Sequence, residues 1–163
     1  MLAPKKFQAA LAAVPLVSLD LVIVRGTSEV LLGLRTNRPA QNFWFVPGGR
    51  IYKNERMQAA MLRIAEKELG LGAALSTGKI SSQPMGAYEH FYADCFAGDV
   101  GISTHYVVLA HLFQVDADFA LPTPADQQHS ALRWWPIAEA LAATEVHQMT
   151  KDYLLALIDK DTL

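Results

Sequence analysis

The amino-acid sequence predicts an α/β or α+β sandwich that forms one domain over residues 1–163. Strand-like segments stand on both sides of a central helical segment, and a further helical region closes the chain. This order of elements is typical of helices packed on a sheet. The 163 residues, 52% of them hydrophobic, suit one domain with a sizeable core, and we find neither internal repeats nor a linker-like stretch.

The N-terminal third predicts one helix and two strands. Residues 4–13 have amphipathic spacing and begin with Pro4, which favours the first turn of a helix. PLVSLDLVIV, at residues 15–24, alternates enough for a strand, and EVLLGLR, at residues 29–35, returns as a second strand after a turn. The stretch RTNRPAQNFWFVPGG is expected to be a long loop with a brief extended FWFV segment.

The middle of the chain contains the clearest helical pattern, at residues 54–69, and Gly70 is well placed to end that helix. Segments near 77–92 and 103–115 are predicted to be strands. The polar, turn-rich stretch LPTPADQQHS is expected to be a surface loop. RWWPI then leads into the last helical region.

That last region is expected to form helical turns at residues 138–144 and 149–159.

The formal net charge is −2 and no long basic run is present, so a nucleic acid is not expected as the main partner. The single cysteine, Cys95, excludes an internal disulfide and fits a reducing compartment, most simply the cytoplasm. No membrane span is expected, since Asp20 interrupts the longest apolar stretch.

The stretch PGGRIYKNERMQAAMLRIAEKELGL has the outline of a helix that follows a ligand-binding loop. On a helix, residues three and four apart share a face, so Ile64, Lys67 and Glu68 point the same way. Gly48 and Gly49 lie just upstream, where the lack of side chains lets a ligand approach the backbone closely.

Glu55 and Arg63 are eight residues apart, so an ion pair between them would tie the helix to its loop.

At these residues the chain resembles the Nudix family, whose box reads G-x5-E-x7-R-E-U-x-E-E-x-G-U, U being a bulky aliphatic residue. The matching positions are Gly49, Glu55, Arg63, Glu68, Gly70 and Leu71. The departures are Ile64 and Lys67 in place of glutamates, and Ala65 as a small version of U.

The resemblance implies a Nudix-type α/β/α sandwich with a mixed sheet and a central box helix. Nudix enzymes hydrolyse nucleoside diphosphates linked to another group, with divalent metal held largely by the box glutamates. The departures and the likeness outside the box, from about residue 7 to residue 135, resemble one branch of the family, the GDP-mannose mannosyl hydrolases. This implies Mg²⁺-dependent hydrolysis of GDP-mannose, or GDP-glucose, with water attacking the anomeric carbon with inversion. A homodimer is a further expectation from the family.

The resemblance also implies a single Mg²⁺ site. Its ligands would be Glu68, the backbone carbonyl of Gly48 or its neighbour Gly49, and Gln128 from the later loop, with Gln127 as the other choice because two glutamines are adjacent. Mg²⁺ prefers oxygen ligands, and the substrate diphosphate and waters would complete the shell.

Four residues match catalytic positions of that branch. They are His129 as the base that deprotonates water, Tyr106 beside the departing GDP, Asp20 at the sugar, and Arg35. For Asp20 a solvent-facing strand position is equally open. His90 and His105 are weaker candidates. His105 alternates with Tyr106, so if Tyr106 faces the ligand, His105 faces away and is expected to have a core or surface role.

Substrate-binding positions in the resemblance are Phe7, near the nucleotide base, and Arg35, Arg50 and Arg63, around the diphosphate and the helix. Packing of the first helix explains Phe7 equally well. For Arg63, a structural pair with Glu55 is at least as well supported as ligand contact.

Two other functions remain open. A conventional Nudix pyrophosphohydrolase would cut a P–O bond of a nucleotide sugar, and it would need compensating acids, for which Asp94 and Asp99 are the nearest residues. A non-catalytic nucleotide-sugar binding module is the other alternative, because two of the box glutamates are missing.

Overall fold

The structure is a computed structural model that describes residues 4–96, 101–120 and 129–159. In chain order its elements are α1 (Pro4–Ala13), β1 (Leu16–Arg25), β2 (Glu29–Arg35), β3 (Trp44–Phe45), β4 (Gly48–Arg50), α2 (Met57–Leu69), α3 (Gly72–Ser76), β5 (Ser82–Tyr92), β6 (Thr104–Val115), β7 (His129–Pro136), α4 (Ile137–Ala142) and α5 (Gln148–Asp159). Within the described residues, no helix is long and apolar enough to cross a membrane.

One seven-stranded sheet forms the centre of the molecule. Its main path has the order β3-β2-β1-β6-β5, while β4 pairs with β1 and β7 pairs with β2. β1 and β6 run parallel, from Leu16 opposite Tyr106 to Arg25 opposite Val115. The other strand pairs are antiparallel, so the sheet is mixed as predicted.

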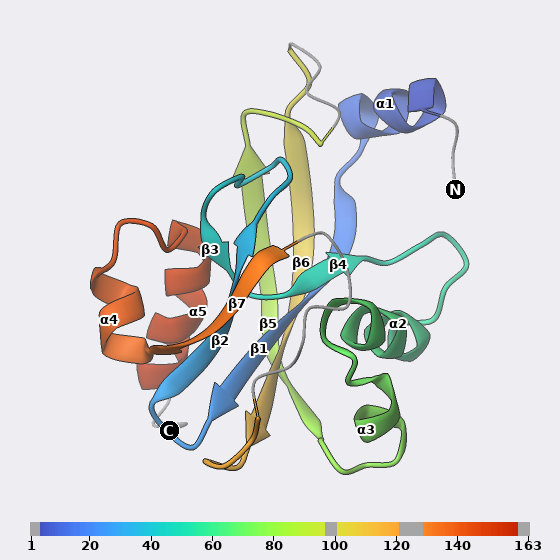
Figure 1. The fold of residues 1–163 in the computed structure, drawn as a ribbon. Coiled ribbons are helices and arrows are strands. Elements are labelled where there is room, and N and C mark those ends of the chain that lie inside the picture. The colour runs from blue at the N-terminus through green and yellow to red at the C-terminus, as the bar shows by residue number, and fades with distance from the viewer. Residues whose placement is uncertain (1–3, 97–100, 121–128, 160–163) are drawn as a thin grey trace.

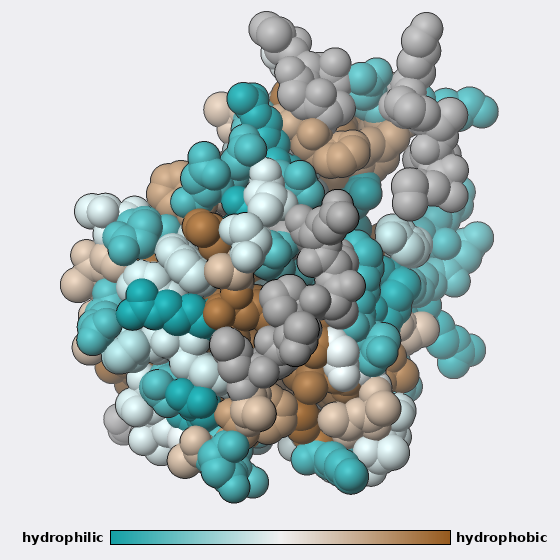
Figure 2. Space-filling model, viewed as in Figure 1, coloured by the Kyte–Doolittle hydropathy of each residue, from teal (hydrophilic) through white to brown (hydrophobic). Residues whose placement is uncertain are grey.

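Helices cover both faces of this sheet (Figure 1). Side chains alternate along a strand, and β1 therefore contributes to two cores. Leu19, Leu21 and Ile23 belong to the core that contains α2, whereas Val22 and Val24 belong to the core that contains α4 and α5. On the face shown in Figure 2, hydrophobic residues gather towards the centre, with hydrophilic residues around much of them. The predicted α/β/α sandwich is confirmed.

The two ends of β1 have different neighbours. At its C-terminal end, Val24 and Arg25 pair with β2. At its N-terminal end, residues 18–20 pair with β4, which places Asp20 directly opposite Gly48. The glycine pair therefore lies beside the acid on β1, although the sequence predicted only a loop there.

The central helix begins later than predicted, at Met57 rather than residue 54. Asn54 has a positive φ of 66°, and Arg56 is extended with φ −71° and ψ 143°, so neither residue continues a helix. The helix ends where predicted, at Gly70, which adopts the left-handed conformation with φ 67°.

Three further predictions are corrected. The segment expected as one strand from residue 77 begins as a strand only at Ser82, and residues 72–76 before it form α3. The stretch expected to lead directly into the C-terminal helices is instead β7, which pairs with β2 from Arg35 opposite His129 to Glu29 opposite Pro136. Consequently His129 and Ser130 are strand residues rather than part of a loop, while residues 121–128 lie outside the described residues.

Candidate active site

A cavity of about 350 Å³ is lined by residues of α1, β1, β2, β3, β4, α2, β5 and β6 and of the loops between them. Its wall brings together residues that lie far apart in the sequence. Those that the sequence singled out are Phe7, Asp20, Arg35, Gly48, Arg50, Arg63, Glu68 and Tyr106. Gln127 and Gln128 lie outside the described residues, and His129 is not among the described residues that line the wall.

Helix α2 presents the box residues to this cavity. Ile64 and Glu68 are both buried, with 2% and 3% of their surfaces exposed, and both lie on the wall together with Lys67. Ile64 packs so closely on Gly49 that a β-carbon there would lie 3.2 Å from its Cγ1 atom. The missing glutamate is thus replaced by a side chain that packs against the glycine loop.

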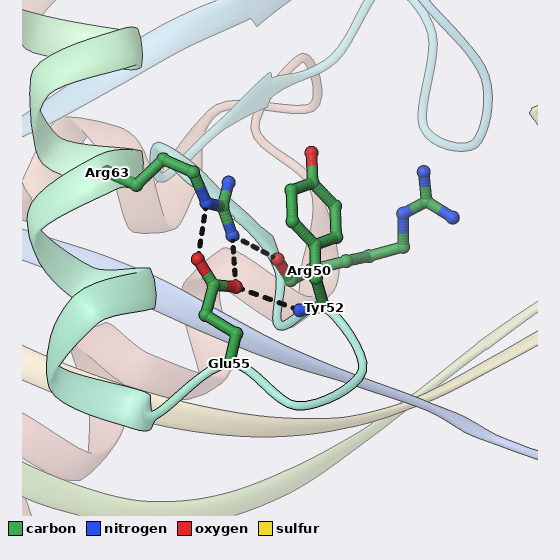
Figure 3. Close-up of polar contacts among 4 residues, drawn as sticks. All are labelled: Arg50, Tyr52, Glu55 and Arg63. Carbon is green, nitrogen blue, oxygen red and sulfur yellow. Dashed lines mark hydrogen bonds and ion pairs between the residues drawn. The ribbon is translucent and has the colours of Figure 1, made fainter. Parts of the chain in front are cut away.

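Arg63 and Glu55 form the predicted ion pair (Figure 3). Arg63 donates to both carboxylate oxygens of Glu55, each at 2.7 Å, and to the backbone carbonyl of Arg50 at 2.9 Å. Glu55 also accepts a hydrogen bond from the backbone N–H of Tyr52 at 2.9 Å. The hydrogen bonds from Arg63 lower the pKa of Glu55. The pair therefore ties the loop after β4 to the box helix, while Arg63 still contributes to the cavity wall.

Glu68 has a second neighbour, His129. The Nδ1 atom of His129 lies 3.2 Å from Glu68 Oε2, and both side chains are almost completely buried. Within the described residues, neither Glu68 Oε2 nor His129 Nε2 has a hydrogen-bond partner. The imidazole also lies directly over Gly33, where a β-carbon would collide with the ring.

These atoms fit a hard divalent cation. A buried carboxylate oxygen without a hydrogen-bond donor is costly unless a positive charge compensates it. Glu68, which carries such an oxygen, is on the cavity wall, and Gly48, with no side chain, brings its backbone to the same wall. A β-carbon at Gly48 would meet Asp20 Oδ1 and would lie 2.8 Å from the carbonyl oxygen of Leu19, so only glycine fits there.

Asp20 is buried on the wall, with 7% of its surface exposed, and the solvent-facing alternative is therefore wrong. Tyr153 donates a hydrogen bond of 2.7 Å to its Oδ2 atom. Burial raises the pKa of Asp20 from 3.8 to about 7, and the hydrogen bond from Tyr153 and the charge of Arg35 oppose that rise.

Cationic and aromatic side chains complete the wall. The Arg50 guanidinium lies 4.3 Å from the centre of the Phe7 ring, and Phe96 meets the same ring edge-on at 6.2 Å. Arg35 donates a hydrogen bond of 3.0 Å from Nε to the carbonyl oxygen of Pro39. Burial raises the pKa of Tyr106, so its hydroxyl is protonated at neutral pH.

Sequence reasoning missed His90, Tyr92 and Tyr153. His90 and Tyr92 line the cavity, and Tyr153 is fully buried behind it. A signal for the two β5 residues was present, because they alternate along one strand and so share a face. His105 points away from the cavity, as predicted, and stacks on the ring of Phe91 with the ring centres 4.3 Å apart.

Replacing Asp20 by Asn is expected to change how the free energy of unfolding depends on pH. A carboxyl whose pKa is 3.8 when unfolded and about 7 when folded binds protons more tightly in the native state. Its contribution to stability therefore falls as pH rises between those values. Relative to the unaltered protein, Asp20→Asn should gain stability from acidic to neutral pH, by at most about 1.4 kcal/mol for each pH unit between the two pKa values.

Urea unfolding of both proteins across this pH range measures the effect. The pKa of His90 is lowered to about 4 by burial, so this residue removes stability as pH falls below its ordinary value. It is present in both proteins, and the difference between them isolates Asp20. A difference in unfolding free energy that stays constant with pH would contradict the raised pKa.

The comparisons with known proteins agree with this geometry. The family model described as NUDIX domain matches residues 15–157. The low-salt glycan biosynthesis protein Agl8 of Haloferax volcanii is 39% identical over 153 residues, which cover 93% of this chain and 88% of that protein.

Solved structures show the same fold at lower sequence identity. The MutT Nudix hydrolase of Burkholderia pseudomallei superposes with a TM-score of 0.65 at 23% identity, covering 88% of this chain and 98% of its own. The Nudix domain of Shewanella oneidensis NrtR, complexed with ADP ribose, has a TM-score of 0.64 at 16% identity, covering 98% of this chain and 93% of its own. Because the family model spans most of the sequence and the Haloferax relative aligns along nearly all of it, the chain belongs to the Nudix hydrolase family.

Proposed function

We propose that the protein hydrolyses GDP-mannose, or GDP-glucose, to GDP and the free sugar, with water attacking the anomeric carbon with inversion. One observation carries this proposal: Asp20 and Glu68 are the only carboxylates among the described residues of the cavity wall, and Glu68 alone comes from the box helix. Among the described residues, no three His, Cys, Asp or Glu side chains are grouped to hold a metal. This supports one cation that relies on substrate oxygens, rather than a multi-metal cluster that activates water at phosphorus.

Mg²⁺ is the proposed cation, and Glu68, the carbonyl of Gly48 and Gln128 are its proposed protein ligands. When bound, Mg²⁺ neutralises charge on the diphosphate and so makes GDP a better leaving group. The protein adds cationic groups around the same position. Arg35 and Arg50 line the cavity, and a guanidinium suits a phosphate better than an ammonium does.

Arg63 has a different part in this proposal. Its Nε and Nη2 atoms already donate to Glu55 and to the Arg50 carbonyl. We therefore assign it mainly to holding the loop that carries Arg50, with any ligand contact secondary. Phe7, whose ring the Arg50 guanidinium covers, is proposed to lie near the nucleotide base.

His129 is the proposed base. The base role needs the tautomer that carries its proton on Nδ1, because Nε2 then accepts a proton. Asp20 is the other candidate, since it is on the cavity wall and has a pKa of about 7, which suits a base at neutral pH. Tyr106 is proposed to donate a hydrogen bond to the departing GDP, for which its protonated hydroxyl is suited.

The relative from Haloferax volcanii is a glycan biosynthesis protein, and a GDP-sugar is the kind of activated sugar that glycan synthesis consumes. This similarity supports the substrate class and leaves the sugar open. The single-domain organisation, the homodimer and the cytoplasmic location stay predictions.

Hydrolysis in ¹⁸O-labelled water tests the reaction directly. With GDP-mannose and Mg²⁺, we expect the label in free mannose and none in GDP, and chelation of the metal should stop turnover. Label in a phosphate, with GMP and mannose-1-phosphate as products, would establish the conventional pyrophosphohydrolase instead. Binding of GDP-mannose without turnover would identify a nucleotide-sugar binding module.

A further inference from the structure

A buried hydrogen-bond network joins the cavity to the C-terminal helix. The hydroxyl of Tyr153, on α5, lies 2.7 Å from Asp20 Oδ2 and 3.0 Å from His90 Nε2. Asp20 belongs to β1 and His90 to β5, strands that are separated in the sheet by β6. One hydroxyl therefore connects residues from three elements.

Only the two ends of this network reach the cavity. Asp20 and His90 line its wall, whereas Tyr153 is not among the described residues of the wall and has no exposed surface. A phenylalanine would fill the same space in the core without a polar atom. The hydroxyl is buried together with the two groups it bonds, which is favourable only because those bonds are made.

The network fixes which atom carries each proton when Asp20 is ionised. An ionised carboxylate only accepts hydrogen bonds, so the Tyr153 hydroxyl then donates to Asp20, and the Tyr153 oxygen accepts from His90 Nε2–H. His90 is neutral, since burial lowers its pKa to about 4. With the proton on Nε2, its Nδ1 atom is an acceptor.

The carboxylate of Asp20 is oriented by the same bond. Its Oδ2 atom faces Tyr153, while Oδ1 lies beside Gly48, where a β-carbon would meet it. Gly48 is part of the cavity wall. Oδ1 is thus the oxygen that can accept a hydrogen bond from a hydroxyl group of a ligand at that wall.

We propose that Tyr153 is a positioning residue that holds Asp20 Oδ1 and the His90 ring in fixed orientations towards the sugar of the substrate. It acts through these two neighbours and does not touch the ligand. This inference rests on the proposed function, because it places the sugar beside Asp20.

Tyr153→Phe tests the role of the hydroxyl, with Tyr88→Phe as the matched control. Tyr88 packs edge-on against Tyr153 with the ring centres 4.6 Å apart, but its side chain does not line the cavity and bonds neither Asp20 nor His90 in the described structure. Loss of a buried hydrogen bond to a charged group should lower kcat for GDP-mannose by about ten- to hundredfold. The Kd for GDP, measured by calorimetry, should change less than about twofold, because Tyr153 is not among the described residues that line the cavity. Tyr88→Phe should keep kcat.

The ¹⁵N chemical shifts of His90 give a readout that does not need activity. In the unaltered protein at alkaline pH, long-range ¹⁵N–¹H spectra should show His90 neutral with its proton on Nε2. In Tyr153→Phe this preference should disappear. A proton on Nδ1 in the unaltered protein, or an unchanged kcat together with unchanged His90 shifts in Tyr153→Phe, overturns the proposal. If the unaltered protein does not hydrolyse GDP-mannose, the proposed function fails, and the His90 shifts alone then decide whether Tyr153 positions the two groups.

Discussion

Glu68→Gln is expected to abolish most turnover while leaving the fold intact. Glu68 is the one carboxylate that the box helix brings to the described cavity wall, and its Oε2 atom is buried without a hydrogen-bond donor. Glutamine has the same shape but no charge, so it is a much weaker ligand for a hard cation. Losing this interaction should reduce kcat by about 10²–10³-fold, the usual effect of removing one electrostatic group from an active site.

Although Glu68→Gln should lose activity, it should not lose stability. A buried carboxylate that lacks a donor is unfavourable in the metal-free protein, so Glu68→Gln should unfold at the same temperature or a higher one.

Glu66→Gln is the matched control. Glu66 lies on the same helix and is exposed, and its Oε2 accepts a hydrogen bond from the N–H of Gly72, which an amide oxygen also accepts. Steady-state kinetics and Mn²⁺ binding followed by electron paramagnetic resonance are the measurements. Unchanged metal affinity in Glu68→Gln would remove Glu68 from the site.

The parts of the fold that the sequence predicts well are those with a strong local pattern. β1, β2 and β6 are runs of aliphatic residues bounded by turns, and α2 has a regular apolar face that ends at Gly70. β7 was missed because its residues gain their extended conformation from pairing with β2, almost a hundred residues earlier in the chain. A two-glycine stretch likewise becomes β4 only because β1 lies beside it. Long-range pairing of this kind leaves no local signal.

In the candidate site, too, the residues with a local sequence pattern were predicted and those placed by long-range contacts were not. Residues within the box were located by their spacing, and the structure brings Gly49, Arg63 and Glu68 among them to one cavity. Tyr153 lies 133 residues from Asp20, on a helix with an ordinary amphipathic pattern, so nothing in the sequence connects the two. The burial of Asp20 was equally hidden, since a carboxylate in an alternating strand is more often exposed.

His129→Gln is expected to have the other large effect. If His129 deprotonates the attacking water, its removal should lower kcat by about 10²–10⁴-fold, the range typical of a general base. Binding of GDP should persist, because the described arginines and Glu68 remain on the cavity wall. Single-turnover kinetics with GDP-mannose and calorimetric titration with GDP measure the two quantities separately. His111→Gln is a matched control, since His111 is also buried but lies outside the described wall of the cavity.

Because His129 is off the described wall, comparing His129→Gln with Asp20→Asn distinguishes the two candidate bases, His129 and Asp20. The ring is held between Glu68 and Gly33 rather than on the described wall, so the base role requires it to reach the sugar when substrate is bound. Asp20 is already on the wall. A loss below about tenfold in His129→Gln, together with a loss of about 10²-fold or more in Asp20→Asn, would transfer the base role to Asp20. A large loss in His129→Gln that does not add to the loss in Glu68→Gln would instead show that the two side chains act as one unit, as their 3.2 Å contact suggests.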